Sequence, residues 1–452
     1  MNLTDLNSGR EIGSNCLHIE LGPFSILVDA GMHPKKIGLD ALPDFSRIPD
    51  HSLDLVLLTH CHLDHIGGLP VVLRQQPQAQ VLMSLPTLTL GPRMLRNSCN
   101  VMRRQRDELG IKAYPLFSFE EIERLENTFT ALPFGKTRQI EKEGQTLEIT
   151  LYRAGHVVGA CGFLLVYKHR RIFITGDVLF NHQRTLPGAD FPTAKLDVLI
   201  IETTRGATER DSDYERDEEI GRLLHAMADT LHQGGSVLIP VFALGRMQEM
   251  IRVIHDARTA RLLPECAVTC SGLGMDLFNY FDTIARKTGL VQFNRKWLHE
   301  LKVKPLRATL VPGKDPGEKG IYLLSSGMLV EHTPSYAAAA SMLAHPHNLI
   351  AFVGYCDPDT PGGRLLDTPH DGTFLFDQLD YVTEVRARIE RFDLSGHADR
   401  DELIDFALET DPRCVVLTHG DPPAREWFNE TLEERAPHIQ RVDPVPGKTY
   451  VV

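Results

Sequence analysis

The chain has 452 residues, of which 42% are hydrophobic and 24% are charged, and its formal net charge is −12. This length is too great for a single ordinary core and predicts two large units. The composition is typical of a globular protein. The negative net charge disfavours nucleic-acid binding over the whole surface, because phosphate contacts need positive charge, although a locally basic groove or a metal ion could supply it.

No apolar run reaches the roughly 20 residues of a membrane-spanning helix, and the first residues lack the basic start and apolar core of an export signal. We therefore expect a cytoplasmic protein without membrane association. The eight cysteines have no disulfide-like spacing, and we expect free thiols. Cys266 and Cys270 could form half of a zinc site, but their alternation with apolar residues favours strand packing.

Short β-branched runs alternate with helical periodicity along the chain, which predicts an α/β protein. The clearest helix covers 217–232, because its apolar residues repeat at helical spacing and two glycines follow it. A buried strand over 236–242 and a helix over 246–257 come next.

Six strand-like runs lead into residue types that bind metals or transfer protons. They are 26–28 before Asp29, 55–58 before His60, 149–152 before His156, 172–174 before Asp177, 198–201 before Glu202 and 415–417 before His419. For any one run, a strand with a polar turn is the simpler interpretation. All of them together favour a common site, because side chains at strand ends are held rigidly.

The segment THCHLDH carries His60, His62, Asp64 and His65. Three imidazoles and a carboxylate at this spacing suit zinc or a similar metal. A lone histidine is more often an ordinary core or surface residue. A purely structural metal site is the weaker interpretation, because such sites use four ligands, usually with cysteines among them.

This HxHxDH motif resembles the signature of the metallo-β-lactamase superfamily, and ILVDAG, AGHVVGA and ITGD are similar to its other motifs. The resemblance implies an αββα sandwich with two zinc ions, for which manganese is an alternative. It implies that one metal is held by His60, His62 and His156, the second by Asp64, His65 and His419, and both by Asp177. Asp29 would orient the histidine loop without being a ligand.

The long stretch between Asp177 and His419 carries LIIETTRGA, IPVFALGRMQEM, LLSSGML, GYCDPDTPGGRLLD and FDLSGHADRDEL. In this order the motifs resemble the β-CASP subfamily of nucleases, in which an α/β β-CASP domain is inserted within the metallo-β-lactamase domain. The resemblance covers nearly the whole chain. It implies a first metallo-β-lactamase part at 1–207, the inserted domain at 208–384 and a returning part at 385–452.

The same resemblance assigns roles to individual residues. Asp64 and Asp177 would act in catalysis with the metals, His397 would protonate the leaving oxygen, and Glu202 would hold its imidazole. A histidine at the position of His419 is associated with RNA-acting members of the subfamily. The candidate substrate-binding residues are Ser326, Gly327, Arg364 and Ser395, some of them through backbone N–H groups.

Basic residues that could grip a nucleic-acid backbone are equally well explained as solvated surface. They are Arg103, Arg104 and Arg106, together with Arg386 and Arg388 on one face of an expected strand. The chain also departs from the usual motifs at ETTRG, CSGLG and LVEHTPSY. These departures concern the substrate and the cleavage mode more than the metal chemistry.

We predict a dinuclear metal-dependent ribonuclease that hydrolyses single-stranded RNA through a metal-activated hydroxide and leaves a 5′-phosphate. The alternatives are a DNA nuclease of the same subfamily, a small-molecule metallohydrolase of thioesterase or lactamase type, and a non-catalytic subunit of an RNA-processing complex. Endo- or exonuclease action and the oligomeric state, a homo-oligomer included, stay open at this stage.

Overall fold

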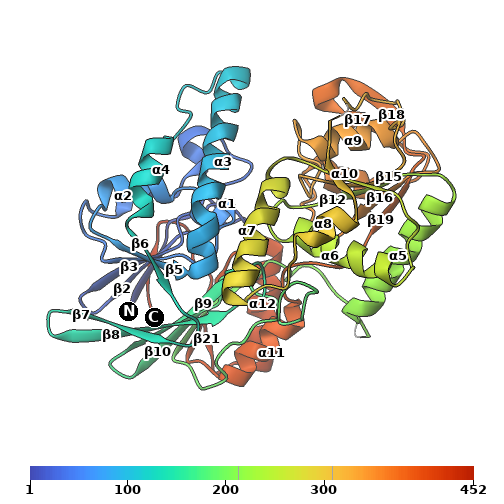
Figure 1. Ribbon diagram of the computed structural model, residues 1–452. Helices are drawn as coiled ribbons and strands as arrows, with labels where there is room; N and C mark the ends of the chain where they lie inside the picture. The colour runs from blue at the N-terminus through green and yellow to red at the C-terminus, as the bar shows by residue number, and fades with distance from the viewer. Residues whose placement is uncertain (212, 308) are drawn as a thin grey trace. The chain divides into compact units, whose positions relative to one another are not determined.

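The computed structural model describes residues 1–211, 213–307 and 309–452, and its contacts divide the chain into two compact units (Figure 1). Unit 1 comprises Met1–His182, Gly188–Arg210 and His397–Val452, and unit 2 comprises Gln183–Pro187 and Asp211–Gly396. The sequence analysis placed the boundaries at 207/208 and 384/385. Residues 385–396 stay with unit 2 because β19 (Arg388–Arg391) pairs in parallel with β16 (Leu349–Phe352).

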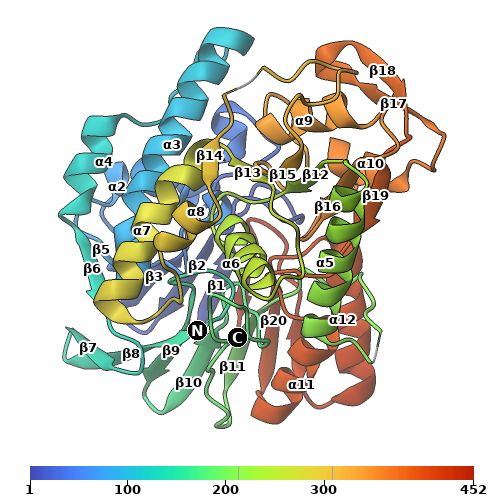
Figure 2. The same cartoon turned by 45° about the vertical axis from the view of Figure 1, so that its right-hand side comes forward.

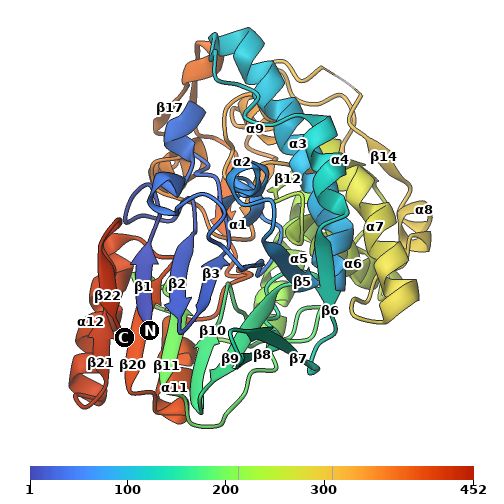
Figure 3. The ribbon, with the colours of Figure 1, turned by 90° about the vertical axis from the view of Figure 1, so that its left-hand side faces the viewer.

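Unit 1 contains two seven-stranded sheets. In spatial order, the first consists of β22 (Thr449–Val451), β1 (Asn2–Asp5), β2 (Leu17–Leu21), β3 (Phe24–Val28), β4 (Leu55–Leu57), β5 (Gln80–Ser84) and β6 (Phe129–Leu132). The second consists of β21 (Gln440–Val442), β20 (Cys414–Thr418), β11 (Val198–Glu202), β10 (Arg170–Ile174), β9 (Cys161–Tyr167), β8 (Gln145–Arg153) and β7 (Thr137–Lys142). The two ends of the chain meet in the first sheet, where Asn2 pairs with Val451 (Figure 3).

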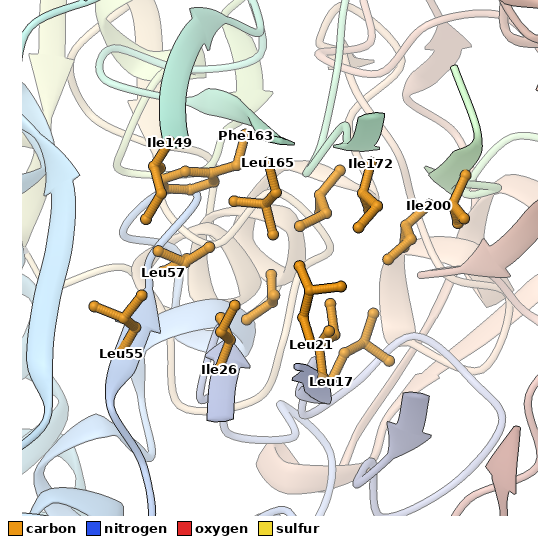
Figure 4. Close-up of a cluster of buried hydrophobic side chains, with 14 of the residues drawn as sticks. Leu17, Leu21, Ile26, Leu55, Leu57, Ile149, Phe163, Leu165, Ile172 and Ile200 are labelled. Atoms are coloured by element: carbon orange, nitrogen blue, oxygen red, sulfur yellow. The ribbon is translucent and has the colours of Figure 1, made fainter. Parts of the chain in front are cut away.

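The core of unit 1 lies between these sheets (Figure 4). Strand alternation explains it, because successive side chains point to opposite faces. In β10, Ile172 and Ile174 enter the core between the sheets, whereas Phe173 joins a second cluster on the outer face. β11 divides its apolar residues in the same way, so both faces of the second sheet are covered.

Helices cover the outer faces of both sheets. On the first sheet, α3 (Leu85–Leu109) contacts β5, β6 and α4 (Phe119–Glu126), and α2 (Leu69–Gln75) contacts α4. On the second, α11 (Arg400–Thr410) and α12 (Pro422–Arg435) supply Leu403, Phe406 and Phe428 to the outer cluster (Figure 2). Unit 1 is therefore an αββα sandwich, as the motifs implied.

Unit 2 is built on one parallel sheet in the order β14-β13-β15-β12-β16-β19, with a separate β17-β18 hairpin. Its remaining strands are β12 (Val237–Pro240), β13 (Ala267–Cys270), β14 (Val303–Pro305), β15 (Gly320–Leu324), β17 (Thr373–Phe376) and β18 (Tyr381–Glu384). Its helices are α5 (Arg216–His232), α6 (Arg246–Thr259), α7 (Gly272–Thr288), α8 (Lys296–Glu300), α9 (Pro334–Met342) and α10 (Pro361–Asp367).

The helices expected at 217–232 and 246–257 are confirmed as α5 and α6, and the strand expected over 236–242 is the shorter β12. Arg386 does not share a strand face with Arg388, because β19 begins only at Arg388. The eight cysteines are free thiols. In the part of the chain that the structure describes, no helix is both long enough and apolar enough to cross a membrane.

Candidate metal centre

The strand ends of unit 1 bring the expected ligands together. His60 follows β4, and His62 lies directly before the one-turn helix α1 (Leu63–Ile66), which carries Asp64 and His65. His156 follows β8, Asp177 follows β10, and His419 follows β20. Each of these residues therefore lies in a segment that follows the carboxyl end of a strand, as the sequence pattern predicted.

The first subsite consists of His60, His62 and His156, which form a group with metal-ligand spacing. His62 Nδ1 lies 3.1 Å from His60 Nε2 and 3.2 Å from His156 Nε2. His60 is fully buried, and burial lowers the pKa of this histidine far below that of a free imidazole. The ring is therefore neutral and keeps a lone pair for a metal.

The second subsite consists of Asp64, His65 and His419. His419 Nε2 lies 3.3 Å from both His65 Nε2 and Asp64 Oδ2. Burial lowers the pKa of His65, but the carboxylates of Asp177, Asp29 and Asp64 outweigh burial and raise it well above its usual value. The subsite thus gathers two imidazoles and one carboxylate.

Asp177 lies between the two subsites. Its Oδ2 atom is 3.7 Å from His60 Nε2 and 3.4 Å from His65 Nε2, and its Oδ1 atom is 3.3 Å from His419 Nδ1. Burial raises the pKa of Asp177, but His419 and His65 outweigh it and hold the pKa well below its usual range. Although Oδ1 is buried, it accepts no hydrogen bond from any described residue.

This donor set fits divalent metal ions. The imidazole nitrogens and carboxylate oxygens are ligands that zinc prefers. A buried carboxylate oxygen without a hydrogen bond is costly unless another partner satisfies it, and a cation beside Asp177 Oδ1 would do so. The residues of the centre are therefore suited to hold a divalent metal ion such as zinc.

Asp29 supports the centre from outside the ligand groups. It accepts hydrogen bonds from the Thr59 backbone N–H at 2.7 Å and from the Thr59 hydroxyl at 2.8 Å, and its Oδ2 atom lies 2.7 Å from His65 Nδ1. A metal bound at Nε2 would replace one proton of the His65 ring and leave the other on Nδ1, where Asp29 accepts it. A carboxylate behind a histidine is a common way to orient a metal ligand.

A second histidine–carboxylate pair lies beside the ligands. Glu202 ends β11, and its carboxylate oxygens are 3.1 and 3.0 Å from His397 Nδ1. Glu202 also accepts a 2.6 Å hydrogen bond from the Val178 backbone N–H, which fixes the carboxylate. The imidazole rings of His397 and His156 are 4.5 Å apart between centroids.

The pKa of His397 follows from this environment. Burial lowers the pKa, but the carboxylate of Glu202 outweighs burial and raises the pKa above its usual value. His397 lies two residues before Asp399, which is the N-cap of α11. The Asp399 side chain accepts a hydrogen bond from the Asp401 backbone N–H, and the Glu402 side chain accepts one from the Asp399 backbone N–H. This capping box fixes the start of the helix directly after His397.

Two further polar residues at the centre were not singled out from the sequence. The Asn15 amide lies beside Asp29 and His65, and the Thr204 hydroxyl is 3.0 Å from His419 Nδ1. Thr204 lies within the motif LIIETTRGA, and Asn15 lies in the segment GREIGSNCLHIE near the start of the chain. Neither residue type indicates metal chemistry by itself, so only the fold reveals their position.

The remaining candidate residues belong to unit 2. Ser326 Oγ accepts from the Val330 backbone N–H, and the Ser326 carbonyl accepts from the Ser335 hydroxyl. Arg364 in α10 pairs with Asp377 at 3.1 Å. The Ser395 carbonyl accepts a hydrogen bond from the buried Arg216, and Gly327 packs beside Phe242.

Four of the five basic residues noted in the sequence have local partners. In α3, the Arg103 guanidinium lies 4.3 Å from the Phe119 ring centroid, and Arg106 pairs with Asp107. Arg386 pairs with Glu384, and Arg388 with Glu390. These contacts favour the interpretation of a solvated surface for most of the group.

Comparison with known proteins identifies the class. Residues 18–202 match the metallo-beta-lactamase superfamily domain, and residues 382–442 match the Zn-dependent metallo-hydrolase RNA specificity domain. A protein of unknown function from Enterococcus faecalis has a similar structure, with a TM-score of 0.55 and 13% identity over 100% of this chain and 99% of that one. The chain therefore contains a metallo-β-lactamase superfamily domain.

The relatives that match nearly the whole chain agree with the subfamily resemblance drawn from the motifs. Integrator complex subunit 11 from Gallus gallus is 26% identical over 100% of this chain and 74% of its own length. Endoribonuclease ysh1 from Schizosaccharomyces pombe is 29% identical over 97% of this chain, and cleavage and polyadenylation specificity factor subunit 3 from Dictyostelium discoideum 27% over 98%. The chain spans only 56% of the length of each of these two.

Proposed function

We propose that this chain is a ribonuclease that hydrolyses phosphodiester bonds of single-stranded RNA at a centre with two zinc ions. The observation that carries the proposal is the pair of ligand groups joined at Asp177, with the Glu202–His397 pair beside them. When bound, two such metals lower the pKa of the attacking water and stabilise the charge that develops on the phosphate. Manganese is an alternative to zinc with the same donors.

The protein residues would complete the reaction at the leaving group. When the P–O bond breaks, the leaving oxygen needs a proton, and a histidine held by a carboxylate can donate one near neutral pH. Glu202 binds His397 through Nδ1, which leaves Nε2 as the atom that would carry the proton. The proton then moves from Nε2 to the leaving oxygen of the RNA.

RNA is favoured over other substrates by two findings. The match at residues 382–442 is to an RNA specificity domain, and ysh1 is named as an endoribonuclease. His419 also lies where RNA-acting members carry histidine. Ser326, Gly327, Arg364 and Ser395 remain candidate residues for binding the RNA.

The test separates metal binding from proton transfer. We expect both Asp177→Ala and His397→Ala to abolish cleavage of end-labelled RNA, while only Asp177→Ala loses bound metal, measured by elemental analysis after gel filtration. Asp107→Ala, which changes an exposed carboxylate at the end of α3, serves as the control and is expected to behave as wild type.

Three results would argue against the proposal. Normal RNA cleavage by His397→Ala would remove its role as the acid. A wild-type protein that binds metal and cleaves thioesters or lactams but no RNA would instead be a small-molecule hydrolase, and cleavage of DNA alone would point to a DNA nuclease.

A further inference from the structure

Asn15 is a buried polar residue of the loop between β1 and β2, with 7% of its surface exposed. A buried amide needs partners for its N–H and C=O groups, because an unsatisfied polar group in the interior is costly. The partners of Asn15 come from segments far apart in the sequence, and all lie next to the metal centre.

The side-chain amide of Asn15 connects N-terminal segments of the chain with the C-terminal strand β20. Its Nδ2 atom donates to Asp29 Oδ2 at 3.1 Å and lies 3.4 Å from His65 Nδ1. Its Oδ1 atom accepts from the Thr418 hydroxyl at 3.4 Å. Thr418 ends β20 and directly precedes His419, so the amide links the support of His65 with the strand that carries His419.

The backbone of Asn15 holds α1 in the same way. The Asn15 N–H donates to the Asp64 carbonyl at 2.8 Å, and the Asn15 carbonyl accepts from the Gly31 N–H at 3.0 Å. These segments are packed tightly, because a Cβ atom at Gly31 would lie 1.8 Å from the Asp64 carbonyl oxygen. Asn15 thus contacts the supports of all three ligands of the second subsite.

We propose that Asn15 is a positioning residue for the second subsite and sets its metal affinity separately from that of the first. The inference rests on the metal centre of the proposed function. It does not depend on RNA as the substrate. The side-chain partners of Asn15 described above are Asp29, His65 and Thr418, and none of them is a ligand of the first subsite.

The chemistry requires an amide at this position. Alanine would leave the Thr418 hydroxyl without its acceptor and remove one donor from Asp29 Oδ2. Aspartate has the same shape, but it would place a second carboxylate next to Asp29 and lose the donor, so like charges would meet in a buried site. Both changes release His65 and His419 from their common support.

The test is a metal titration of metal-free protein with Co²⁺, followed by its absorption spectrum, and with Zn²⁺ by calorimetry. We expect wild type to bind two equivalents. Asn15→Ala is expected to keep one tight equivalent and to bind the other about 10–100-fold more weakly, the usual effect of removing a residue that supports a ligand. Excess metal should restore the second equivalent and RNA cleavage together.

Matched variants exclude a general loss of structure. Ser14→Ala changes the neighbouring buried residue, whose hydroxyl bonds to Ser8, and it should bind both equivalents as wild type does. Thr418→Val removes only the hydroxyl that reaches Asn15 and should weaken the same equivalent to a smaller degree. If Asn15→Ala fails to fold, this variant decides the question.

Two tight equivalents in Asn15→Ala, or in Thr418→Val if that variant must stand alone, would overturn the inference. An equal loss of both equivalents in a folded variant would also overturn it. Failure of the proposed function is distinguishable, because the titration contains no RNA. A wild type that binds two metals and cuts no RNA would refute the ribonuclease proposal and leave the role of Asn15 intact.

Discussion

At the scale of single residues, the pair formed by Glu202 and His397 distinguishes this centre from a site that only binds metal ions. Glu202 is 1% exposed and accepts from both the Val178 backbone N–H and His397 Nδ1. A buried carboxylate fixed by the backbone can hold an imidazole in one tautomer and one orientation.

We predict that Glu202→Gln lowers the rate of RNA cleavage about 100-fold or more, because general acid catalysis contributes about 10²–10⁴-fold. Metal content should stay at the wild-type level, because Glu202 is not one of the proposed ligands. Single-turnover kinetics and elemental analysis of the same samples measure both quantities. Glu123→Gln, at an exposed position of α4, is the control, and an unchanged rate in Glu202→Gln would remove the pair from the mechanism.

At this scale the sequence identified the chemical residues and missed their supports. His60, His62, Asp64 and His65 stand out because their types bind metals and their spacing is short. Asn15 carries an ordinary polar side chain more than 400 residues away from its partner Thr418. Its position follows from the return of the C-terminal strands beside the first ones, which no local pattern encodes.

Among the structural elements, the one-turn helix α1 is packed closely against the loop after β3. It carries Asp64 and His65, and its Asp64 carbonyl faces Gly31 and the Asn15 N–H. A side chain at Gly31 would meet backbone atoms, which cannot move aside as the end of a side chain can. Glycine is therefore required for the approach of α1 to the loop after β3.

Two glycine substitutions should have opposite effects. Gly31→Ala is expected to destabilise the protein by about 1–3 kcal/mol through overpacking and to reduce metal binding at the second subsite. Gly221→Ala, inside α5 with open space around it, is expected to stabilise by about 1 kcal/mol through helix propensity. Melting temperatures measure both, and an unchanged melting temperature in Gly31→Ala would contradict the packing described here.

Helices and strands with a strong apolar pattern could be predicted from the sequence. Which of the two units a segment belongs to was harder to predict. The apolar runs of β10 and β11 and the helical spacing of α5 are local properties that a sequence displays. The resemblance to the subfamily placed residues 385–396 in the returning part. The parallel pairing of β19 with β16 places them in unit 2, and such pairing is a long-range property.

At the scale of the whole molecule, the proposed metal ligands lie in one unit while each unit has its own core. The chain has two tryptophans, Trp427 in α12 of unit 1 and Trp297 in α8 of unit 2. Each can therefore report on one unit. Metal that binds only the folded state stabilises the unit that holds it.

We predict that chelation of the metals lowers the unfolding temperature reported by Trp427 by several degrees more than that reported by Trp297. The variants Trp297→Phe and Trp427→Phe leave one reporter each, and their fluorescence is followed during heating with and without chelator. An equal decrease for both reporters would show that the two units unfold together. A decrease for Trp297 alone would contradict a metal centre in unit 1.

The most direct measurement is product analysis after single-turnover cleavage of single-stranded RNA in ¹⁸O-labelled water, with metal-loaded wild type and Asp177→Ala side by side. Hydrolysis by an attacking water predicts products with a 5′-phosphate that carries one ¹⁸O atom, formed by wild type alone. Cleavage should persist when the ribose before the scissile bond is replaced by deoxyribose. Products with a 2′,3′-cyclic phosphate, or equal cleavage by Asp177→Ala, would contradict metal-dependent hydrolysis at this centre.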